Sequence, residues 1–261
     1  MLGRAAGGAQ PRQAGASLRA EYDESRRQWA ARRRRSVWLS ALWWGPAAVA
    51  LGVLAGVGVK YALFGLLVTA LVIAAAIDVG FRHPQSMDRL KARADAEAGT
   101  ARELRPLQIR GGAQTLHDRV YMPFGGGESF EVEHLVITPR GVFMVDSKEW
   151  HGFDVRLLGL DLFVNHVKQD EAMARMRAHA AELGKALGEA ARADVEVGVV
   201  DVTSVIAVHA EGITGTPRVM YGVIVVRPEQ LNEVLRAADL RWSPTATENL
   251  VAAAEALLPP R

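Results

Sequence analysis

Residues 37–79 form a nearly charge-free stretch, which limits the possible folds of the chain more than any other part of the sequence. A helix needs about 20 apolar residues to cross the roughly 30 Å hydrocarbon core of a bilayer. Val37–Val59 and Tyr61–Val79 are each long enough, and Lys60 marks a tight turn between them. The pattern predicts two transmembrane α-helices joined as a hairpin. A helical hairpin buried in a soluble core is disfavoured, because two consecutive apolar spans of this length rarely lie inside so small a protein.

Basic residues flank the outer ends of both predicted spans, whereas only Lys60 lies between them. Four arginines, Arg32–Arg35, end a basic juxtamembrane segment over residues 19–36. Because Lys and Arg are enriched on the cytoplasmic side of membrane helices, we expect a multi-pass cell-membrane protein with both termini and the C-terminal domain in the cytoplasm. Small residues such as Gly52 and Gly56 would also allow a homo-oligomer to form through the helices.

The overall charge hides a split between the two halves of the chain. The formal net charge is +2, but residues 1–86 carry about +7 and residues 87–261 about −5. The C-terminal half is therefore mildly acidic, and its net negative charge does not favour binding to DNA. Cysteine is absent, which excludes disulfide frameworks, thiolate zinc sites and cysteine nucleophiles.

The rest of the chain divides into a disordered start and one folded domain. Residues 1–18 are rich in Gly, Ala and Gln without an apolar period, which predicts disorder. Residues 87–261 alternate between helical and strand patterns, which predicts an α/β domain with a mixed sheet flanked by helices. The expected strands are 115–121, 130–137, 142–148, 154–158, 162–165, 205–209 and 219–226, and the expected helices are 88–107, 168–191, 229–235 and one capped by Ser243.

Two adjacent strands of this domain carry the side chains best suited to chemistry. Alternation places Glu131 and Glu133 on one face of the first strand, and Asp146 and Lys148 on one face of the second. Facing carboxylates repel each other unless a cation lies between them, and hard divalent cations prefer carboxylate oxygens. The pattern indicates a metal site, with Lys148 placed to hold a phosphate or to help activate a water molecule.

The register of this hairpin decides whether the carboxylates meet. If the loop is only Pro139-Arg140, then Thr138 pairs with Gly141 and Glu133 lies opposite Asp146. A three-residue loop would instead shift the register by one and separate the two carboxylates. The metal hypothesis needs the first register or a compensating bulge.

Three segments in order resemble the motifs of the NERD (nuclease-related) domain, a branch of the PD-(D/E)xK nucleases. Glu97-Ala-Gly-Thr-Ala-Arg102 is similar to the family's Glu-x-x-Thr-Ala-Arg, and Val132-Glu-His-Leu-Val-Ile137 to its Ile-Asp-His-Leu-Val-Ile. The run from Gly141 to Gly152 is similar to Gly-Val-Phe-x-Ile-Asp-x-Lys followed by an aromatic residue and Gly. The resemblance extends over roughly residues 90–210.

The resemblance implies a restriction-endonuclease-like core and hydrolysis of nucleic-acid phosphodiesters that depends on Mg²⁺ or Mn²⁺. It implies Glu97, Glu133 and Asp146 as metal ligands and Lys148 as the catalytic cation. Gln169, at the start of the long helix, matches a polar site residue of related nucleases. The family's acid in the first strand is usually Asp, and Glu133 stands in its place here.

Two other functions compete with a nuclease. A catalytically inactive, membrane-tethered module that binds protein or nucleic acid is favoured by the acidic domain and by Glu133 in place of Asp. A transporter is disfavoured, because a lone hairpin without charge inside the membrane offers no pathway.

Zinc chemistry is not indicated, since no zinc-ligand spacing links His117, His134, His151, His166, His179 and His209.

Overall fold

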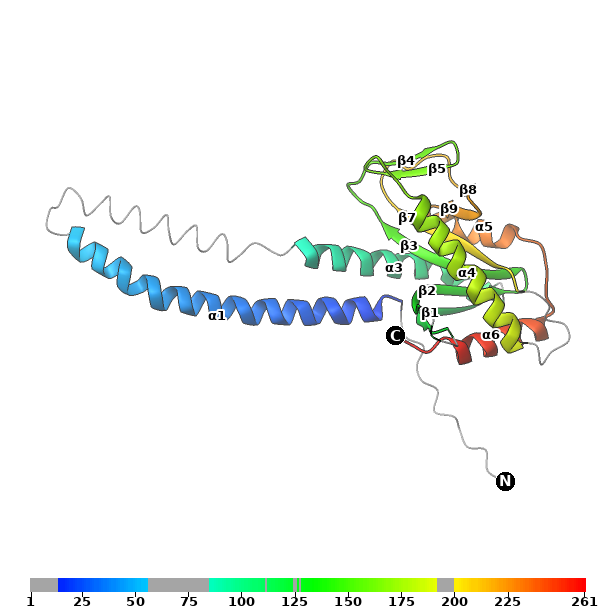
Figure 1. The fold of residues 1–261 in the computed structure, drawn as a ribbon, viewed down its shortest axis with the longest axis horizontal. Coiled ribbons are helices and arrows are strands. Elements are labelled where there is room, and N and C mark those ends of the chain that lie inside the picture. Colours follow the sequence, from blue (N-terminus) through cyan, green and yellow to red (C-terminus); the bar gives the residue numbers. More distant parts are fainter. Residues whose placement is uncertain (1–13, 56–84, 111, 124–125, 127, 192–199) are drawn as a thin grey trace, which may run out of the picture. The chain divides into compact units, whose positions relative to one another are not determined.

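The computed structural model describes residues 14–55, 85–110, 112–123, 126, 128–191 and 200–261 (Figure 1). The chain forms two compact units. The first contains Arg19–Lys91, and the second contains Ala92–Arg261 together with the start of the chain up to Leu18.

Helix α1 (Ala16–Ala55) supplies most of the first unit, and α3 (Gln85–Arg110) begins in it. Within the part of the chain that is described, no helix is both long enough and apolar enough to cross a membrane. The predicted transmembrane hairpin therefore gains no support. The described part of α1 reaches Ala55, inside the first predicted span, 37–59, and the rest of that span and the second span, 61–79, lie outside the described residues.

A six-stranded mixed sheet forms the centre of the second unit, in the order β1-β2-β3-β7-β9-β8. Strands β1, β2 and β3 pair antiparallel, β3, β7 and β9 pair parallel, and β8 returns antiparallel at the edge. This arrangement, with helices on both faces, confirms the predicted mixed α/β fold. The strands are β1 (Gln114–Tyr121), β2 (Phe130–Thr138), β3 (Gly141–Glu149), β7 (Val202–His209), β8 (Arg218–Met220) and β9 (Val223–Val226).

A second, smaller sheet follows β3 in the chain. It consists of β4 (Val155–Leu158), β5 (Asp161–Val164) and β6 (Val167–Lys168), all paired antiparallel. The hairpin predicted over 154–165 is present in it.

Helices cover both faces of the large sheet (Figure 1). One buried cluster joins Val142 and Met144 of β3 to α4 (Asp170–Ala191) and α6 (Pro244–Leu257), while the other joins Phe143 and Val145 to α3 and α5 (Leu231–Ala237). A one-turn 3₁₀ helix, η1 (Pro228–Gln230), leads into α5. Because successive strand residues point to opposite faces, the residues after Val145 continue this alternation and reach the two faces in turn.

The end of the domain shows one confirmed detail and one difference from the sequence prediction. The Ser243 side chain accepts a hydrogen bond from the Ala246 backbone N–H and caps α6, as predicted. The strand predicted over 219–226 is instead the hairpin β8–β9. Tyr221 and Gly222 both have positive φ values, 50° and 79°, as a tight two-residue turn between antiparallel strands requires.

The N-terminal segment contacts the α/β domain through its last residues. Of residues 1–18, which were predicted to be disordered, 1–13 lie outside the described residues, and Ala14 and Leu18 are buried. The backbone N–H and the hydroxyl of Ser17 donate to the Asp118 carboxylate of β1 at 3.0 and 2.8 Å. The α/β domain therefore includes residues that lie before α3 in the chain.

Candidate metal-dependent active site

The hairpin of β2 and β3 has the register that the metal hypothesis requires. Thr138 pairs with Gly141, and the ladder continues to His134 opposite Val145. The Thr138 hydroxyl accepts hydrogen bonds from the backbone N–H groups of Arg140 and Gly141, both at 3.0 Å, and so closes the two-residue loop. The ladder ends at the His134–Val145 pair, and Glu133 and Asp146 are the next residues along the two strands, on the same face as Leu135 and Met144.

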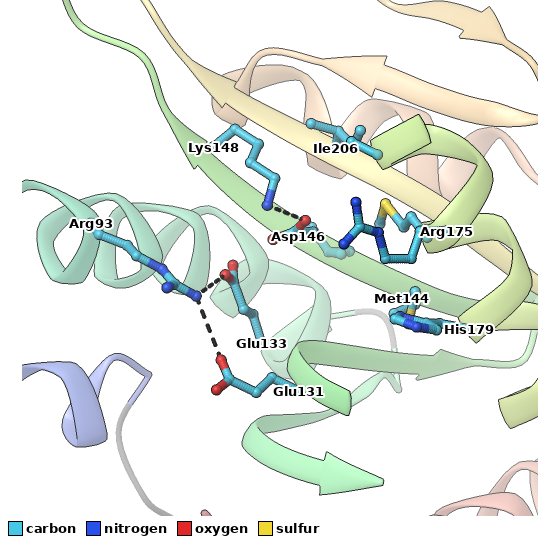
Figure 2. Close-up of a pocket in the computed structure, with 12 residues that line it drawn as sticks. Arg93, Glu131, Glu133, Met144, Asp146, Lys148, Arg175, His179 and Ile206 are labelled. Carbon is cyan, nitrogen blue, oxygen red and sulfur yellow. Dashed lines mark hydrogen bonds and ion pairs between the residues drawn. The ribbon is translucent and has the colours of Figure 1, made fainter. Parts of the chain in front are cut away.

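Glu133 and Asp146 line one pocket of about 360 Å³, together with Lys148 from β3 (Figure 2). One carboxylate oxygen of Glu133, Oε2, accepts the Ser147 backbone N–H at 2.6 Å. Burial raises the pKa of Glu133 well above its ordinary value, and the negative charges of Asp146 and Glu97 raise it further. The two strand carboxylates therefore lie in one pocket and interact electrostatically, although the β2–β3 ladder ends one residue before them.

Lys148 supplies a cation that faces these acids. Its Nζ lies 2.5 Å from Oδ2 of Asp146. Burial works against the charge of the lysine, but the negative charges of Asp146 and Glu133 outweigh it and raise the pKa of Lys148. Lys148 is therefore a firmly protonated ammonium group within the pocket.

Arg93 of α3 supplies a second cation and meets three carboxylates, of which Glu131 and Glu133 are drawn in Figure 2. Its guanidinium lies 3.1 Å from Glu133, 3.6 Å from Glu131 and 3.7 Å from Glu97. The sequence analysis missed Arg93, although its position four residues before Glu97 on a predicted helix places both side chains on one helix face.

Glu97 is buried on α3 and pairs with Arg93 without lining the pocket. Burial raises the pKa of Glu97 to about 7, against the opposing charge of Arg93 and with the help of the charges of Asp118 and Asp146. The structure thus brings Glu97 into electrostatic contact with the strand acids but separates it from the pocket surface.

Gln169 lies directly before α4, where its backbone carbonyl accepts a hydrogen bond from the Met173 N–H. Its side-chain amide donates to the carbonyl of Val167 at 3.1 Å. Gln169 does not line the pocket, so the structure does not bring it together with the strand acids and Lys148.

Helix α4 lines the same pocket with side chains that the sequence analysis did not single out for a site. Arg175, Met176 and His179 are among the lining residues. The His179 ring stacks on Phe130 of β2 with their centroids 4.0 Å apart and their planes 2° from parallel. The i, i+4 spacing of Arg175 and His179 on the predicted helix is the signal that places them on one face.

The other face of β2 and β3 carries a buried chain of neutral polar groups. His117 and His134 lie 2.8 Å apart through their Nδ1 atoms, and His134 Nε2 lies 3.3 Å from the Ser147 hydroxyl. That hydroxyl donates to Thr100 of α3 at 2.9 Å, and Thr100 in turn lies 2.9 Å from His209. Three of the histidines predicted to be scattered are therefore joined in one network.

A divalent cation fits the carboxylates of the pocket by donor chemistry. Within the described ranges, no three or more His, Asp or Glu side chains stand close enough together to hold a metal ion. Mg²⁺, however, is commonly bound by one or two carboxylates, with water and substrate phosphates completing its six ligands. Glu133 and Asp146 provide such a pair, and burial together with the negative charge of Asp146 raises the pKa of Glu133.

Comparison with known proteins gives one match. Residues 92–209 match the family model of NERD, the nuclease-related domain. Every residue that lines the pocket falls within this NERD segment, which runs from the second turn of α3 to the end of β7. The match confirms the resemblance drawn from the three sequence motifs. No curated protein and no solved structure matches the chain.

Proposed function

We propose that this protein is a membrane-anchored nuclease that hydrolyses phosphodiester bonds of nucleic acids with Mg²⁺ or Mn²⁺ held by Glu133 and Asp146. The observation that carries the proposal is the convergence of these two carboxylates with Lys148 in one pocket of the NERD segment. The six-stranded mixed sheet around the pocket is compatible with the restriction-endonuclease-like core that the resemblance implies.

A bound divalent cation would polarise the scissile phosphate and lower the pKa of an attacking water molecule. Lys148, beside Asp146, would stabilise negative charge that develops on the phosphoryl oxygens. Glu133 is oriented for this chemistry by the Ser147 N–H, which holds one of its two oxygens. Glu97, which is buried on α3 and does not line the pocket, would act on the strand acids through its charge rather than as a metal ligand.

The pocket also offers cations to a polyanionic substrate, although residues 87–261 are acidic overall. Arg175 lines the pocket from α4 and Lys148 from β3. Phosphate contacts from Lys and Arg position a nucleic-acid strand without reading its sequence. We therefore expect cleavage with little sequence preference and with a strong dependence on salt concentration.

One observation favours a second function, a catalytically inactive module that binds protein or nucleic acid. Arg93 already pairs with Glu133 and Glu131, so a permanent ion-pair cluster could take the place of a metal. A longer Glu133 where the family usually has Asp points in the same direction, because metal catalysis is sensitive to ångström-scale displacement of its ligands.

A nicking assay distinguishes the two functions. The full chain is incubated with supercoiled plasmid and Mg²⁺ or Mn²⁺, beside Lys148→Ala and a control, Lys185→Ala, which removes an exposed lysine of α4 outside the pocket. The nuclease proposal expects nicking by the wild type and by the Lys185 variant, and loss of nicking in the Lys148 variant. Equal nicking by all three proteins, or none by any of them, would favour the binding module.

Attachment to the membrane is a separate part of the proposal, supported by the sequence alone. The nearly charge-free stretch 37–79 and the basic segment 19–36 support a cell-membrane location with the NERD segment in the cytoplasm. Alkaline carbonate extraction of cell membranes tests it. The full chain is expected in the pellet and a chain lacking 37–79 in the supernatant, whereas release of both would refute the anchor.

A further inference from the structure

Arg93 reaches from α3 to acids on its own helix and on β2. It meets Glu97 one helical turn away, and Glu131 and Glu133, which are two residues apart on one strand. Arginine is the residue best suited to such contacts, because its planar guanidinium presents several donors at once. Arg93 thus neutralises the acids that surround the proposed metal site.

The oxygens of the two strand acids are not equally available to a metal. Both oxygens of Glu133 are engaged, Oε2 by the Ser147 backbone N–H and Oε1 by Arg93 at 3.1 Å. Asp146 pairs with Lys148 through Oδ2, and its Oδ1 has no hydrogen-bond or ion-pair partner among the described residues. A divalent cation that bridges the two acids must therefore take an oxygen of Glu133 from one of its present partners.

Of the two partners of Glu133, Arg93 is the one that a metal ion can displace. Its side chain is 44% exposed, whereas that of Glu133 is 8% exposed. An arginine exposed to this extent can turn into solvent and recover its hydration, while the incoming cation replaces the positive charge that buried Glu133 would otherwise lose. The Ser147 N–H cannot leave, because it belongs to the backbone of a central strand.

We propose that Arg93 is a resident counter-ion of the acidic pocket, which a divalent metal must displace from Glu133 in order to bind. This inference rests on the proposed metal site and adds that Arg93 competes with the metal ion for Glu133. The guanidinium holds the acids together when no metal is present. Metal binding then breaks the ion pair between Arg93 of α3 and Glu133 of β2.

Metal titration of three variants tests the displacement. Mn²⁺ is titrated calorimetrically into the metal-free full chain, Arg93→Gln, Arg93→Lys and a control, Arg105→Gln, which makes the same charge change on α3 outside the pocket. Removal of a positive charge about 3–4 Å from the ligand oxygens should lower the Kd of Mn²⁺ by about tenfold or more in Arg93→Gln. Arg93→Lys should stay closer to wild type, and Arg105→Gln should match it.

Unchanged or weaker Mn²⁺ binding in a folded Arg93→Gln protein would overturn the inference, and so would absence of binding in every protein. Asp146→Asn separates the two proposals. Loss of binding in that variant while Arg93→Gln binds like wild type would keep the metal site and remove only the counter-ion role.

A second measurement follows Arg93 itself in the wild-type chain and uses a variant only to assign its resonance. The Arg93 side-chain Nε–H resonance of the wild-type chain, assigned by its absence in Arg93→Lys, is followed during titration with diamagnetic Mg²⁺. Displacement predicts a shift to the position of a solvent-exposed arginine and faster hydrogen exchange at saturation. An unchanged resonance at saturating Mg²⁺ would contradict it.

Discussion

The two faces of the β2–β3 hairpin hold polar clusters of opposite character. On the α4 side, Glu133, Asp146 and Lys148 are charged groups at the edge of a pocket. On the α3 side, His134, Ser147 and Thr100 form a fully buried chain, and burial lowers the pKa of His134 far below its ordinary value. The charged side chains therefore lie beside counter-ions and solvent, whereas the fully buried side chains are neutral.

Ser147 links the two clusters. Its backbone N–H holds Glu133 in the pocket, while its hydroxyl is bound to Thr100 in the buried chain. Because Ser147 lies between Asp146 and Lys148 in the sequence, fixing it also fixes the strand segment that carries both. We infer that the neutral cluster fixes the position of this strand segment, whereas the charged cluster carries out the proposed chemistry. Changes on the two sides should therefore have different consequences.

The largest expected effect is on activity and comes from the charged side. Asp146→Asn removes the charge of a proposed metal ligand and the partner of Lys148, so nicking should fall on the order of 100-fold or more. The melting temperature should change little, because the amide fits the same space and repulsion of Glu133 is relieved. Plasmid nicking and thermal melting of the full chain check both halves. An active Asp146→Asn protein would remove the charged cluster from the chemistry.

Glu97 should give the stability of the metal-free protein a distinct pH dependence. Its pKa is raised from 4.5 to about 7 in the fold, so the folded state holds a proton that the unfolded state releases between these pH values. The stability of wild type relative to Glu97→Gln should therefore be greatest below pH 4.5 and fall by up to about 3 kcal/mol as the pH rises to 7.

Urea denaturation in EDTA at several pH values measures this difference. A difference between wild type and Glu97→Gln that stays constant from pH 4.5 to 7 would mean that Glu97 is not the perturbed acid described above.

On the neutral side, the expected loss is in stability. Thr100→Val leaves the Ser147 hydroxyl and His209 without their shared partner, which should cost about 1–3 kcal/mol. Thr247→Val is the matched control, because the Thr247 hydroxyl donates only to the carbonyl of Ser243 and its loss should cost less. Urea denaturation gives both values. Equal costs would show that the buried chain is no stronger than an ordinary helix-cap contact.

The weakest of these effects should be on DNA binding and should come from Arg175 at the rim of the pocket. Arg175→Gln removes one exposed cation of α4, so DNA binding in the absence of hydrolysis should weaken a few-fold and its salt dependence should decrease by about one phosphate contact. Fluorescence anisotropy with a labelled oligonucleotide and Ca²⁺, at several salt concentrations, measures both. An unchanged salt slope would place the nucleic acid away from α4.

Much of the fold and the core of the site followed from the sequence. Strand alternation and the Thr138–Gly141 turn predicted the register that brings Glu133 and Asp146 together, because both depend on local rules. The β8–β9 turn was missed, since Tyr221 rarely adopts a positive φ and only Gly222 signalled it.

Contacts between distant elements could not be predicted in the same way. Arg93 and Glu131 are 38 residues apart in the sequence, and only the packing of α3 beside β2 brings them together. The same holds for Thr100 with Ser147 and for Arg175 with the strand acids. Gln169 was expected at the site on resemblance alone, but its side chain bonds to the nearby Val167 carbonyl instead.

The proposed nuclease function requires that Glu133 and Asp146 share one divalent cation. Anomalous diffraction from crystals of the protein soaked in Mn²⁺ tests it most directly. We predict a single strong peak within about 2.0–2.3 Å of one oxygen from each carboxylate, with Arg93 moved away from Glu133. No peak between the two acids, with Arg93 still bound to Glu133 at saturating Mn²⁺, would contradict the account.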